Sequence, residues 1–563
     1  MQYNSKQTGI ATMKPLTAWL SVALALTAHL SHARYSSPNF NKGGFGPWHP
    51  SSRGRPIPLP RVYQTAESTL RIDPRSFHFN IIENECETLQ DAVKRYKTLI
   101  FKPANFKPCK NVEATCDGGD CLKQIDIHLQ SPCEEWPPVR MDEKYLLQLN
   151  TDKAKGGATL SASSIWGILR GLETFSQIVH YHDCQFLVNT TFIEDWPRFP
   201  WRGLLLDTSR HFLPKTTIFE TLDLMAMNKL NVFHWHIVDD NSFPYESARF
   251  PFLSKSGSYG QELVYTRKDL KDILEYARRR GIRVVPEFDT PGHTQSWGRD
   301  LPGFLTPCGA GNSWAAKEDL PEYGPIDPSR EENYAFLWKF FGEVLETFPD
   351  QFLHLGGDEV DFRCWSMDEN IRNFMKKHNI SDYEGLEGYY FRRLLKLLDD
   401  ISSKKKNYMV WQEVFDNQVP LDPDAVVQIW KEKWENDMAQ VTLAGNPALL
   451  SSCWYLDYIS YGTDWEEYYK CDPENFPGTP AQKRLVLGGE VCMWGEFTDS
   501  TNVHSRLWPR GSVAAERLWS AREAQDGDFL ASRMNEHRCR LRRRGFPAQP
   551  INGPDFCEHL KAP

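Results

Sequence analysis

The stretch 203–238, GLLLDTSRHFLPKTTIFETLDLMAMNKLNVFHWHIV, decides the fold class of this chain. It opens on a short apolar segment at 203–207, continues through an amphipathic pattern over 216–228, and closes on a second apolar segment at 231–238. A strand, a helix and a second strand in this order form a βαβ unit with parallel strands. The stretch therefore predicts one repeat of an alternating α/β fold.

The same alternation continues toward the C-terminus. Further strands are expected at 283–288, 352–355, 408–411, 425–430, 448–453 and 485–491, and further helices at 267–280, 331–347, 384–401 and 435–444. Eight strands over about 350 residues predict an α/β fold of the closed (β/α)8 TIM barrel type, which we place at 199–563. A doubly wound open sheet is the alternative. It is disfavoured because no glycine-rich phosphate-binding loop follows the first strand.

Residues 61–198 have a different pattern, which predicts a small α+β domain in front of the barrel. Strands are expected at 76–82, 124–129 and 145–149, and helices at 89–97 and 163–179. Residues 34–60 are rich in Ser, Pro, Gly and Arg. This composition is typical of an extended tail or linker.

The N-terminal residues 1–33 have the pattern of a secretory signal peptide. Lys14 is followed by an apolar run at 16–30 and by a small-x-small cleavage pattern that ends at Ala33. Because the pattern starts at Met13, either Met1 or Met13 is the initiator. No later apolar run reaches 18 residues, so the sequence predicts no transmembrane segment. The sequons at Asn189 and Asn379 predict N-glycosylation in the same route.

Thirteen cysteines in a secretory chain predict disulfides and, because the number is odd, at least one free thiol. Five of them cluster in the α+β domain, with a spacing that zinc sites also use: Cys86, Cys109, Cys116, Cys121 and Cys133. Disulfides are favoured over zinc here because no histidine pair stands at ligand spacing and the compartment is oxidising.

The composition points to a neutral or small partner. The chain has 563 residues, a net charge of -9 and a pI near 6.0, and no basic stripe combines with aromatic residues, so no nucleic-acid partner is expected. The aromatic content is 13%, with 19 Trp, and indole rings suit stacking on sugar faces. Filling of the hydrophobic core is the alternative role for these Trp residues.

Polar and aromatic side chains follow every predicted barrel strand, at the end where barrel enzymes build their active sites. In chain order they are Arg210, Asp239, Asp240, His293, Asp358, Glu359, Trp411, Glu413, Trp430, Tyr455, Asp457, Trp494 and Glu496. The adjacent acids Asp358 and Glu359 suit cleavage of a glycosidic bond, which needs one protonated and one ionised carboxyl group. A strand followed by an acidic helix cap is the alternative interpretation of this pair.

Five motifs resemble those of the glycoside hydrolase family 20 β-N-acetylhexosaminidases. They are RGLLLDTSR at 202–210, HWHIVDD at 234–240, PEFDTPGH at 286–293, HLGGDEV at 354–360 and WGE at 494–496. The resemblance extends over most of the chain from about residue 61. Within the family it is strongest to the animal lysosomal subunits of the neutral-substrate (beta) type, which pair as dimers and carry a small α+β domain before the barrel.

The resemblance implies an exo-acting, retaining enzyme that removes terminal β-linked GlcNAc or GalNAc without a cofactor or a metal. The substrate's 2-acetamido oxygen attacks the anomeric carbon and forms an oxazolinium intermediate. Glu359 is the implied general acid and base, Asp358 holds the acetamido N–H, and Tyr455 donates a hydrogen bond to the acetamido oxygen. The implied substrate is an oligosaccharide, a glycoprotein or a glycolipid.

The remaining implied roles concern binding and support. Arg210 and Glu496 bind sugar hydroxyls, and Asp239 with His293 supports the acid pair. The implied walls of the pocket are Trp411, Trp430 and Trp494. Asp457, followed by Tyr458, resembles the subunit type that prefers neutral substrates. His234 and His236 alternate with Trp235 on a strand and are interpreted as structural, not as a metal pair.

The resemblance also implies a homodimer or heterodimer, a lysosomal or secreted location, and the disulfides Cys86–Cys133, Cys308–Cys364 and Cys539–Cys557. The pairing of the other cysteines stays open: Cys109, Cys116, Cys121, Cys184, Cys453, Cys471 and Cys492. Two rival functions remain at this point. One is a non-catalytic sugar-recognition protein on the same barrel, and the other is a glycosidase with Glu413 or Asp239 as a protein nucleophile.

Overall fold

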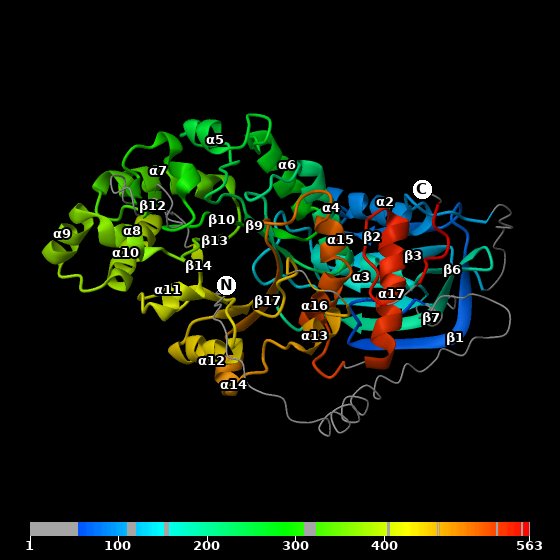
Figure 1. Cartoon of the computed structure of the whole chain (residues 1–563). Helices are drawn as coiled ribbons and strands as arrows, with labels where there is room; N and C mark the ends of the chain where they lie inside the picture. Colours follow the sequence, from blue (N-terminus) through cyan, green and yellow to red (C-terminus); the bar gives the residue numbers. More distant parts are fainter. Residues whose placement is uncertain are drawn as a thin grey trace, which may run out of the picture. The chain divides into compact units, whose positions relative to one another are not determined.

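The computed structural model describes residues 54–109, 120–150, 157–308, 323–401, 406–458, 460, 462–524, 527–552 and 555–561 (Figure 1). The predicted signal peptide, residues 34–53 of the predicted linker and Cys116 lie outside these ranges. Among the described residues, no helix combines the length and the apolar character needed to cross a membrane.

The small domain is an α+β fold, as predicted. Its sheet has the order β1-β7-β4-β5-β3-β2, with β6 beside β7. The strands are β1 (Val62–Ile72), β2 (His78–Glu83), β3 (Gln124–Leu129), β4 (Tyr145–Leu149), β5 (Thr159–Ala162), β6 (His180–His182) and β7 (Gln185–Asp195), and the helices are α2 (Glu87–Phe101) and α3 (Ile165–Ile178). The sequence did not predict β1, because most of its residues are exposed and it lacks an apolar alternation.

Residues 54–60 correct the predicted linker, since they are packed into the folded body. Ile57 is fully buried against Val513, Leu530 and Met534. Its N–H donates to Gln177 Oε1 at 2.9 Å, and Gln177 Nε2 donates back to its carbonyl at 2.8 Å. A Pro-rich composition indicates an extended backbone, but it does not reveal that one apolar residue of the segment is buried.

The barrel is closed by eight parallel strands in the order β10-β13-β14-β15-β16-β17-β8-β9, which confirms the predicted fold. The strands are β8 (Trp201–Asp207), β9 (Val232–His236), β10 (Arg283–Glu287), β13 (Phe352–His354), β14 (Asn407–Trp411), β15 (Val426–Ile429), β16 (Ala448–Leu450) and β17 (Val486–Met493). Because β8 pairs with both β9 and β17, the alternative of an open sheet is wrong.

Helices follow the strands at the predicted places. The predicted helices are α4 (Lys215–Met227), α6 (Arg267–Arg278), α7 (Glu331–Thr347), α10 (Tyr383–Ile401) and α12 (Trp434–Ala444). Two helices that the sequence did not predict, α16 (Arg510–Trp519) and α17 (Gly527–Arg544), follow β17. Helix α17, red in Figure 1, joins the two domains. Its Arg533 pairs with Glu516 of α16, and its Arg544 pairs with Glu173 of α3.

The barrel interior is layered. The lowest layer is apolar and consists of Trp201, Val232, Val285, Phe352, Met409, Val426 and Leu449. Because side chains alternate along a strand, the residues two positions later form the next layer. Fully buried polar side chains lie there, among them His234, Glu287, His354 and Gln428. A charged layer thus lies between the apolar floor and the carboxyl ends of the strands.

All three implied disulfides are present: Cys86–Cys133, Cys308–Cys364 and Cys539–Cys557. Two of the open pairings are also resolved, as Cys109–Cys184 and Cys453–Cys471. Cys121 is disulfide-bonded as well, so disulfides are confirmed over zinc for the described cysteines of the small domain. Within the described ranges Cys492 is the free thiol, and it is buried.

Candidate active site

The two acids stand on a backbone turn that glycine makes possible. After β13, Gly356 and Gly357 have φ values of +72° and +99°. A Cβ on Gly356 would lie 1.6 Å from Asp289 Oδ1, so no other residue fits there without displacing Asp289. Gly357 N–H donates to the same oxygen at 2.9 Å. The turn is therefore held against the loop that follows β10, immediately before Asp358.

Asp358 and Glu359 differ in exposure and share one partner. The Asp358 side chain is 12% exposed, whereas the Glu359 side chain is 61% exposed and open to an incoming ligand. His293 Nε2 lies 3.6 Å from Asp358 Oδ2 and 3.7 Å from Glu359 Oε2. A single imidazole thus faces both carboxylates.

Asp239 holds the other side of that imidazole. Its Oδ1 lies 3.3 Å from His293 Nδ1, and its Oδ2 accepts from His236 and Arg210, each at 2.8 Å. Burial alone would raise the pKa of Asp239, but His293, His236 and Arg210 outweigh it and hold the pKa well below its ordinary value. Burial likewise opposes a charge on His293, yet Asp239, Asp358 and Asp289 raise its pKa well above the ordinary value.

Arg210 lies at the centre of a second group of acids. Its guanidinium is 3.0 Å from Asp207, 2.8 Å from Asp239 and 3.9 Å from Glu496, and it lies over the Trp494 ring at 5.2 Å. Asp207 was missed in the sequence, although it ends the first barrel strand. The rule that selected the other strand ends would have found it.

Aromatic side chains enclose the same space. Trp430 stacks on Tyr455 with ring centroids 6.3 Å apart, and Tyr455 contacts Tyr458 at 5.6 Å. Trp411, one of the three predicted walls of the pocket, is 1% exposed and donates its indole N–H to Glu287. The centroid of the Trp411 ring lies 5.9 Å from that of Trp494, so Trp411 supports the Trp494 wall from beneath the pocket.

Burial raises the pKa of three groups around this space. It raises the pKa of Glu413 to about 7 and that of Asp457 to about 6. Burial, then Cys492 and Asp358 among others, raises the pKa of Tyr455 well above its ordinary value. Tyr455 therefore remains a neutral hydrogen-bond donor at every physiological pH.

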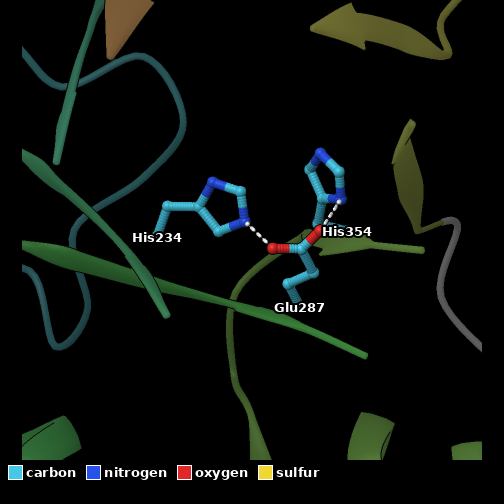
Figure 2. Close-up of side chains that lie close together, drawn as sticks. All are labelled: His234, Glu287 and His354. Atoms are coloured by element: carbon cyan, nitrogen blue, oxygen red, sulfur yellow. Dashed lines mark ion pairs between the residues drawn. The ribbon is translucent and has the colours of Figure 1, made fainter. Parts of the chain in front are cut away.

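Among the residues that the structure describes, three groups of His, Asp and Glu lie close enough together to hold a cation: His234, Glu287 and His354; Asp239, Asp240 and His293; and Asp289, His293 and Asp358. Figure 2 shows the first group, in which the Glu287 carboxylate lies between the two imidazoles. His234 and His236 share the inward face of β9, and both contact Glu287. Each of these two imidazoles lies between two carboxylates, His234 between Glu287 and Glu490 and His236 between Glu287 and Asp239.

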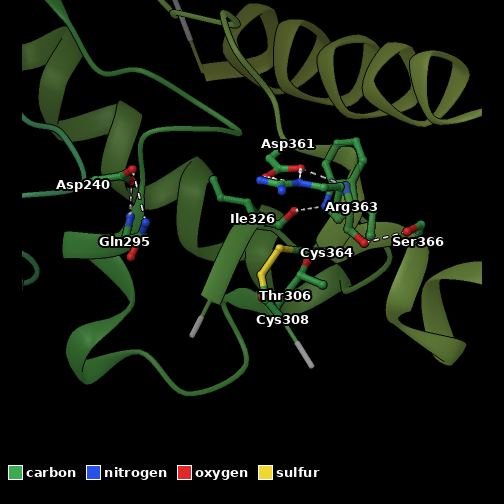
Figure 3. The surroundings of a disulfide bond; sticks show 10 residues. Asp240, Gln295, Thr306, Cys308, Ile326, Asp361, Arg363, Cys364 and Ser366 are labelled. Atoms are coloured by element: carbon green, nitrogen blue, oxygen red, sulfur yellow. Dashed lines mark hydrogen bonds and ion pairs between the residues drawn. A yellow bond between two sulfur atoms is a disulfide. The ribbon is translucent and has the colours of Figure 1, made fainter. Parts of the chain in front are cut away.

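Figure 3 shows the disulfide between Cys308 and Cys364, which lies a few positions after Glu359 in the sequence. Cys364 lies in α8 (Phe362–Met367), which begins just after Glu359, and the neighbouring Trp365 indole N–H donates to the Ile326 carbonyl at 3.1 Å. Gly324 packs directly on the disulfide, since a Cβ there would lie 2.6 Å from Cys364 Sγ. The segment after Glu359 is thus covalently tied to the β11 (Leu305–Pro307) hairpin.

Replacing both Cys308 and Cys364 by Ser is expected to lower the free energy of unfolding by about 2–4 kcal/mol and to reduce kcat. The closed loop has a sequence separation of 56, whereas the Cys539–Cys557 bridge has a separation of 18. Chemical unfolding and steady-state kinetics measure the two effects. The matched C539S/C557S variant should lose less stability and retain kcat. Equal kcat values in both variants would contradict the anchoring role.

Comparison with known proteins agrees with this geometry. The family described as "Glycosyl hydrolase family 20, catalytic domain" matches residues 199–522, and "beta-acetyl hexosaminidase like" matches residues 56–178. The chain is 48% identical to "Beta-hexosaminidase subunit beta" of Mus musculus, over 88% of this chain and 91% of that protein. It is 46% identical to "Beta-hexosaminidase subunit alpha" of Rattus norvegicus, over 89% of this chain and 94% of that protein.

A solved structure has the same architecture. The chitobiase of Flavobacterium johnsoniae superimposes with a TM-score of 0.74 at 29% identity, over 87% of this chain and 72% of that chain. The family match covers more than half of the sequence, and the mouse and rat relatives are covered almost completely. The chain therefore belongs to glycosyl hydrolase family 20.

Proposed function

We propose that this chain is an exo-acting β-N-acetylhexosaminidase that removes terminal, non-reducing β-linked GlcNAc or GalNAc from glycoconjugates with retention. One observation carries the proposal: Asp358 and Glu359 stand together at the end of β13, with His293 Nε2 3.6 Å and 3.7 Å from their carboxylates. Membership in family 20 and the similarity to β-hexosaminidase subunits support the same activity.

The substrate supplies the nucleophile. The 2-acetamido oxygen forms a bond to C1 while the bond from C1 to the leaving oxygen breaks, and Glu359 gives its proton to that oxygen. Water then attacks C1 of the oxazolinium ion, gives a proton to Glu359 and restores the acetamido group. Two inversions at C1 leave the configuration retained.

The two carboxylates considered as protein nucleophiles are poorly suited to that role. Asp239 is buried and already pairs with His236, His293 and Arg210. Glu413 accepts a hydrogen bond from Trp430 at 2.9 Å, and with a pKa raised by burial to about 7 it is neutral at acidic pH. A neutral carboxyl group is a weak nucleophile.

Asp358 is the residue that holds the acetamido N–H, and Tyr455 donates to the acetamido oxygen. The burial of Asp358 strengthens its interaction with positive charge that develops on the acetamido group. The neutral phenol of Tyr455 fixes the direction of the attacking oxygen. The attacking group is then held close to C1, which is the condition for the large rate gains of intramolecular reactions.

Arg210 and Glu496 bind hydroxyls of the terminal sugar. Asp207 and Asp239 fix the Arg210 guanidinium by ion pairs. Glu496 lies farther from the guanidinium, at 3.9 Å, so a sugar hydroxyl can bind between these two groups. Trp430 and Trp494 pack around the buried cluster of Leu205, Trp411, Tyr455 and Cys492, which closes the bottom of the site. A closed end supports exo action, and the non-catalytic alternative has no use for an imidazole shared by two acids.

Neutral glycans are the preferred substrates at pH values where Asp457 is ionised, because its carboxylate repels anionic substituents. Burial, assisted by Glu496, raises its pKa to about 6, so the carboxylate is present above that pH and lost below it. Selectivity for a neutral over a 6-sulfated aryl glycoside is expected to rise by about tenfold as the pH increases through about 6.

The ratio of kcat/KM for the two glycosides, measured across this pH range, checks the expectation. The Asp457→Asn variant has no carboxylate to ionise at this position. Its ratio of kcat/KM for the neutral over the sulfated glycoside should therefore stay low and should not change with pH. A ratio in the unaltered protein that does not change with pH would show that Asp457 does not set selectivity.

The assembly is a homodimer or a heterodimer with a related subunit, and the compartment is the lysosome, reached by the secretory route. The names of the mouse and rat relatives as beta and alpha subunits support pairing. The described disulfides and the predicted signal peptide support an oxidising route. Light scattering of the purified protein, alone and with a related subunit, tests the assembly.

Release of a chromophore from an aryl β-N-acetylglucosaminide at acidic pH tests the activity directly. Hydrolysis with retention, followed by NMR of the first-formed sugar, is the expected result. Inversion, or no hydrolysis by the folded protein, would reject the proposal.

A further inference from the structure

A buried carboxylate lies beneath the pocket at the centre of the barrel. Glu287 of β10 is fully buried. Its Oε2 contacts His236 Nδ1 at 2.5 Å and His234 Nε2 at 3.1 Å, and its Oε1 accepts from the Trp411 indole N–H at 2.7 Å. His354 Nδ1 lies 3.2 Å from Oε1 (Figure 2). Glu287 thus contacts groups from three other strands.

His236 connects this carboxylate to the active site. Its Nδ1 faces Glu287 and its Nε2 faces Asp239 at 2.8 Å. A neutral imidazole would turn a lone pair toward one of these carboxylates, so the ring carries both protons. Burial opposes that charge, but Glu287 and Asp239 outweigh burial and raise the pKa of His236 to about 10.

The charges alternate along a buried path that ends at the acid pair. His234 lies between Glu287 and Glu490, and these two carboxylates overcome burial and raise its pKa to about 9. From Glu287 the path runs through His236 to Asp239, and from Asp239 to His293 and Arg210. His293 then faces Asp358 and Glu359.

We propose that Glu287 is a positioning residue for Glu359: it keeps His236 doubly protonated, and His236 in turn holds Asp239 against His293. The inference rests on the proposed role of Glu359 as the general acid and base. Glu287 itself is too deeply buried to touch a substrate. It acts by fixing the charge and orientation of groups that do face the pocket.

The charged and titratable neighbours of this path come from several elements, and they include Cys492 of β17 near Glu287 and Asp240 beside Asp239. Glu287 faces His234 and His236 of β9 and His354 of β13. Burial lowers the pKa of His354, and its Nδ1 accepts the Gly356 N–H at 3.1 Å, so both the burial and this hydrogen bond disfavour a charge on the ring. His236 also feels Asp207, and His293 has Asp289 and Arg210 beside it. Two imidazolium ions therefore depend on Glu287.

The sign of the effect on the pH profile follows from this arrangement. With Glu287 present, the high pKa of His236 keeps it charged throughout the working range. Glu287→Gln removes the negative charge while keeping the shape, and burial then lowers the pKa of His236 toward or below its ordinary value. Activity should be lost as the pH rises through that lower pKa. The descending limb of the kcat/KM profile should therefore move to lower pH.

The test compares the unaltered protein, Glu287→Gln and Glu490→Gln from about pH 4 to about pH 9 with an aryl β-N-acetylglucosaminide. Glu287→Gln is expected to shift the descending limb down by about one pH unit or more and to lower kcat by about tenfold or more, with little change in KM. Glu490→Gln is the matched control. Glu490 is equally buried and also contacts His234, but it does not contact His236. The descending limb of the kcat/KM profile should therefore stay in place in the Glu490→Gln variant.

A Glu287→Gln variant with an unmoved limb and unchanged kcat would overturn the inference. The double variant His236→Asn/Glu287→Gln has no imidazole at position 236 to titrate, so the descending limb of its kcat/KM profile should not be shifted. A shift that persists in this double variant would also overturn the inference. Should Glu287→Gln fail to fold, Glu287→Asp keeps the charge and withdraws it by one methylene. It is expected to lower kcat while keeping the limb, and full activity would count against the inference.

Glu359→Gln separates the two proposals. If it is inactive while Glu287→Gln behaves like the unaltered protein, only the role of Glu287 fails. If Glu359→Gln retains full activity, the proposed function fails as well.

Discussion

Replacing Glu359 by Gln is expected to lower kcat by about 10²–10⁴-fold for substrates with a poor leaving group, because the amide cannot protonate the departing oxygen. The side chain is 61% exposed, so the substitution fills no cavity and leaves no buried group unpaired. The fold and the melting temperature should be unchanged. Steady-state kinetics with oligosaccharides and with activated aryl glycosides measure the effect.

The dependence of the rate on the leaving group distinguishes the loss of the general acid from general damage to the active site. An activated aryl leaving group needs little protonation, so the first step should be much less impaired than with an oligosaccharide. Glu332→Gln, an exposed acid on α7, is the matched control and should retain the kcat of the unaltered protein. An unchanged rate of Glu359→Gln on oligosaccharides would remove this residue from the mechanism.

Replacing the 2-acetamido group of the substrate by a hydroxyl group is expected to slow hydrolysis by several orders of magnitude. The tethered nucleophile contributes an effective molarity of up to about 10⁵–10⁸ M, and the hydroxyl analogue loses all of it. The ratio of kcat/KM for an aryl β-N-acetylglucosaminide and the aryl β-glucoside with the same leaving group measures the loss.

A fluorinated series refines this experiment. Successive fluorine atoms on the acetyl methyl group weaken the acetamido oxygen as a nucleophile, so kcat should fall with each one. Rapid turnover of the β-glucoside would instead indicate a nucleophile on the protein. Glu413 and Asp239 would then be the residues to replace.

The barrel was predictable because its elements repeat a local pattern. Helix α7 has the predicted bounds, Glu331–Thr347, since its apolar residues recur at helical spacing. Strand β1 and the buried segment around Ile57 were not predictable in this way. Most of β1 is exposed, and Ile57 is buried by contacts with α16 and α17 that lie more than 400 positions away in the sequence.

The candidate site was predictable where a residue ends a strand. Asp358, Glu359, Arg210 and Glu496 follow strands, and the contacts of His293 and Arg210 bring them to one end of the barrel. Glu287 is the last residue of β10, and it was overlooked because the sequence gives no sign that this carboxylate points into the barrel toward its partners. His354 and Trp411 are far from it in sequence and meet it only because the sheet closes.

The amino-acid sequence alone determined the order of strands and helices and the residue types at each strand end, because periodicity and strand termination are local properties. Only the tertiary structure decided which of these groups carry a charge. Burial raises the pKa of Glu413 to about 7 and of Asp457 to about 6, whereas two carboxylates overcome burial and raise that of His236 to about 10. A pKa depends on desolvation and on neighbouring charges, and both are set by contacts between distant parts of the chain.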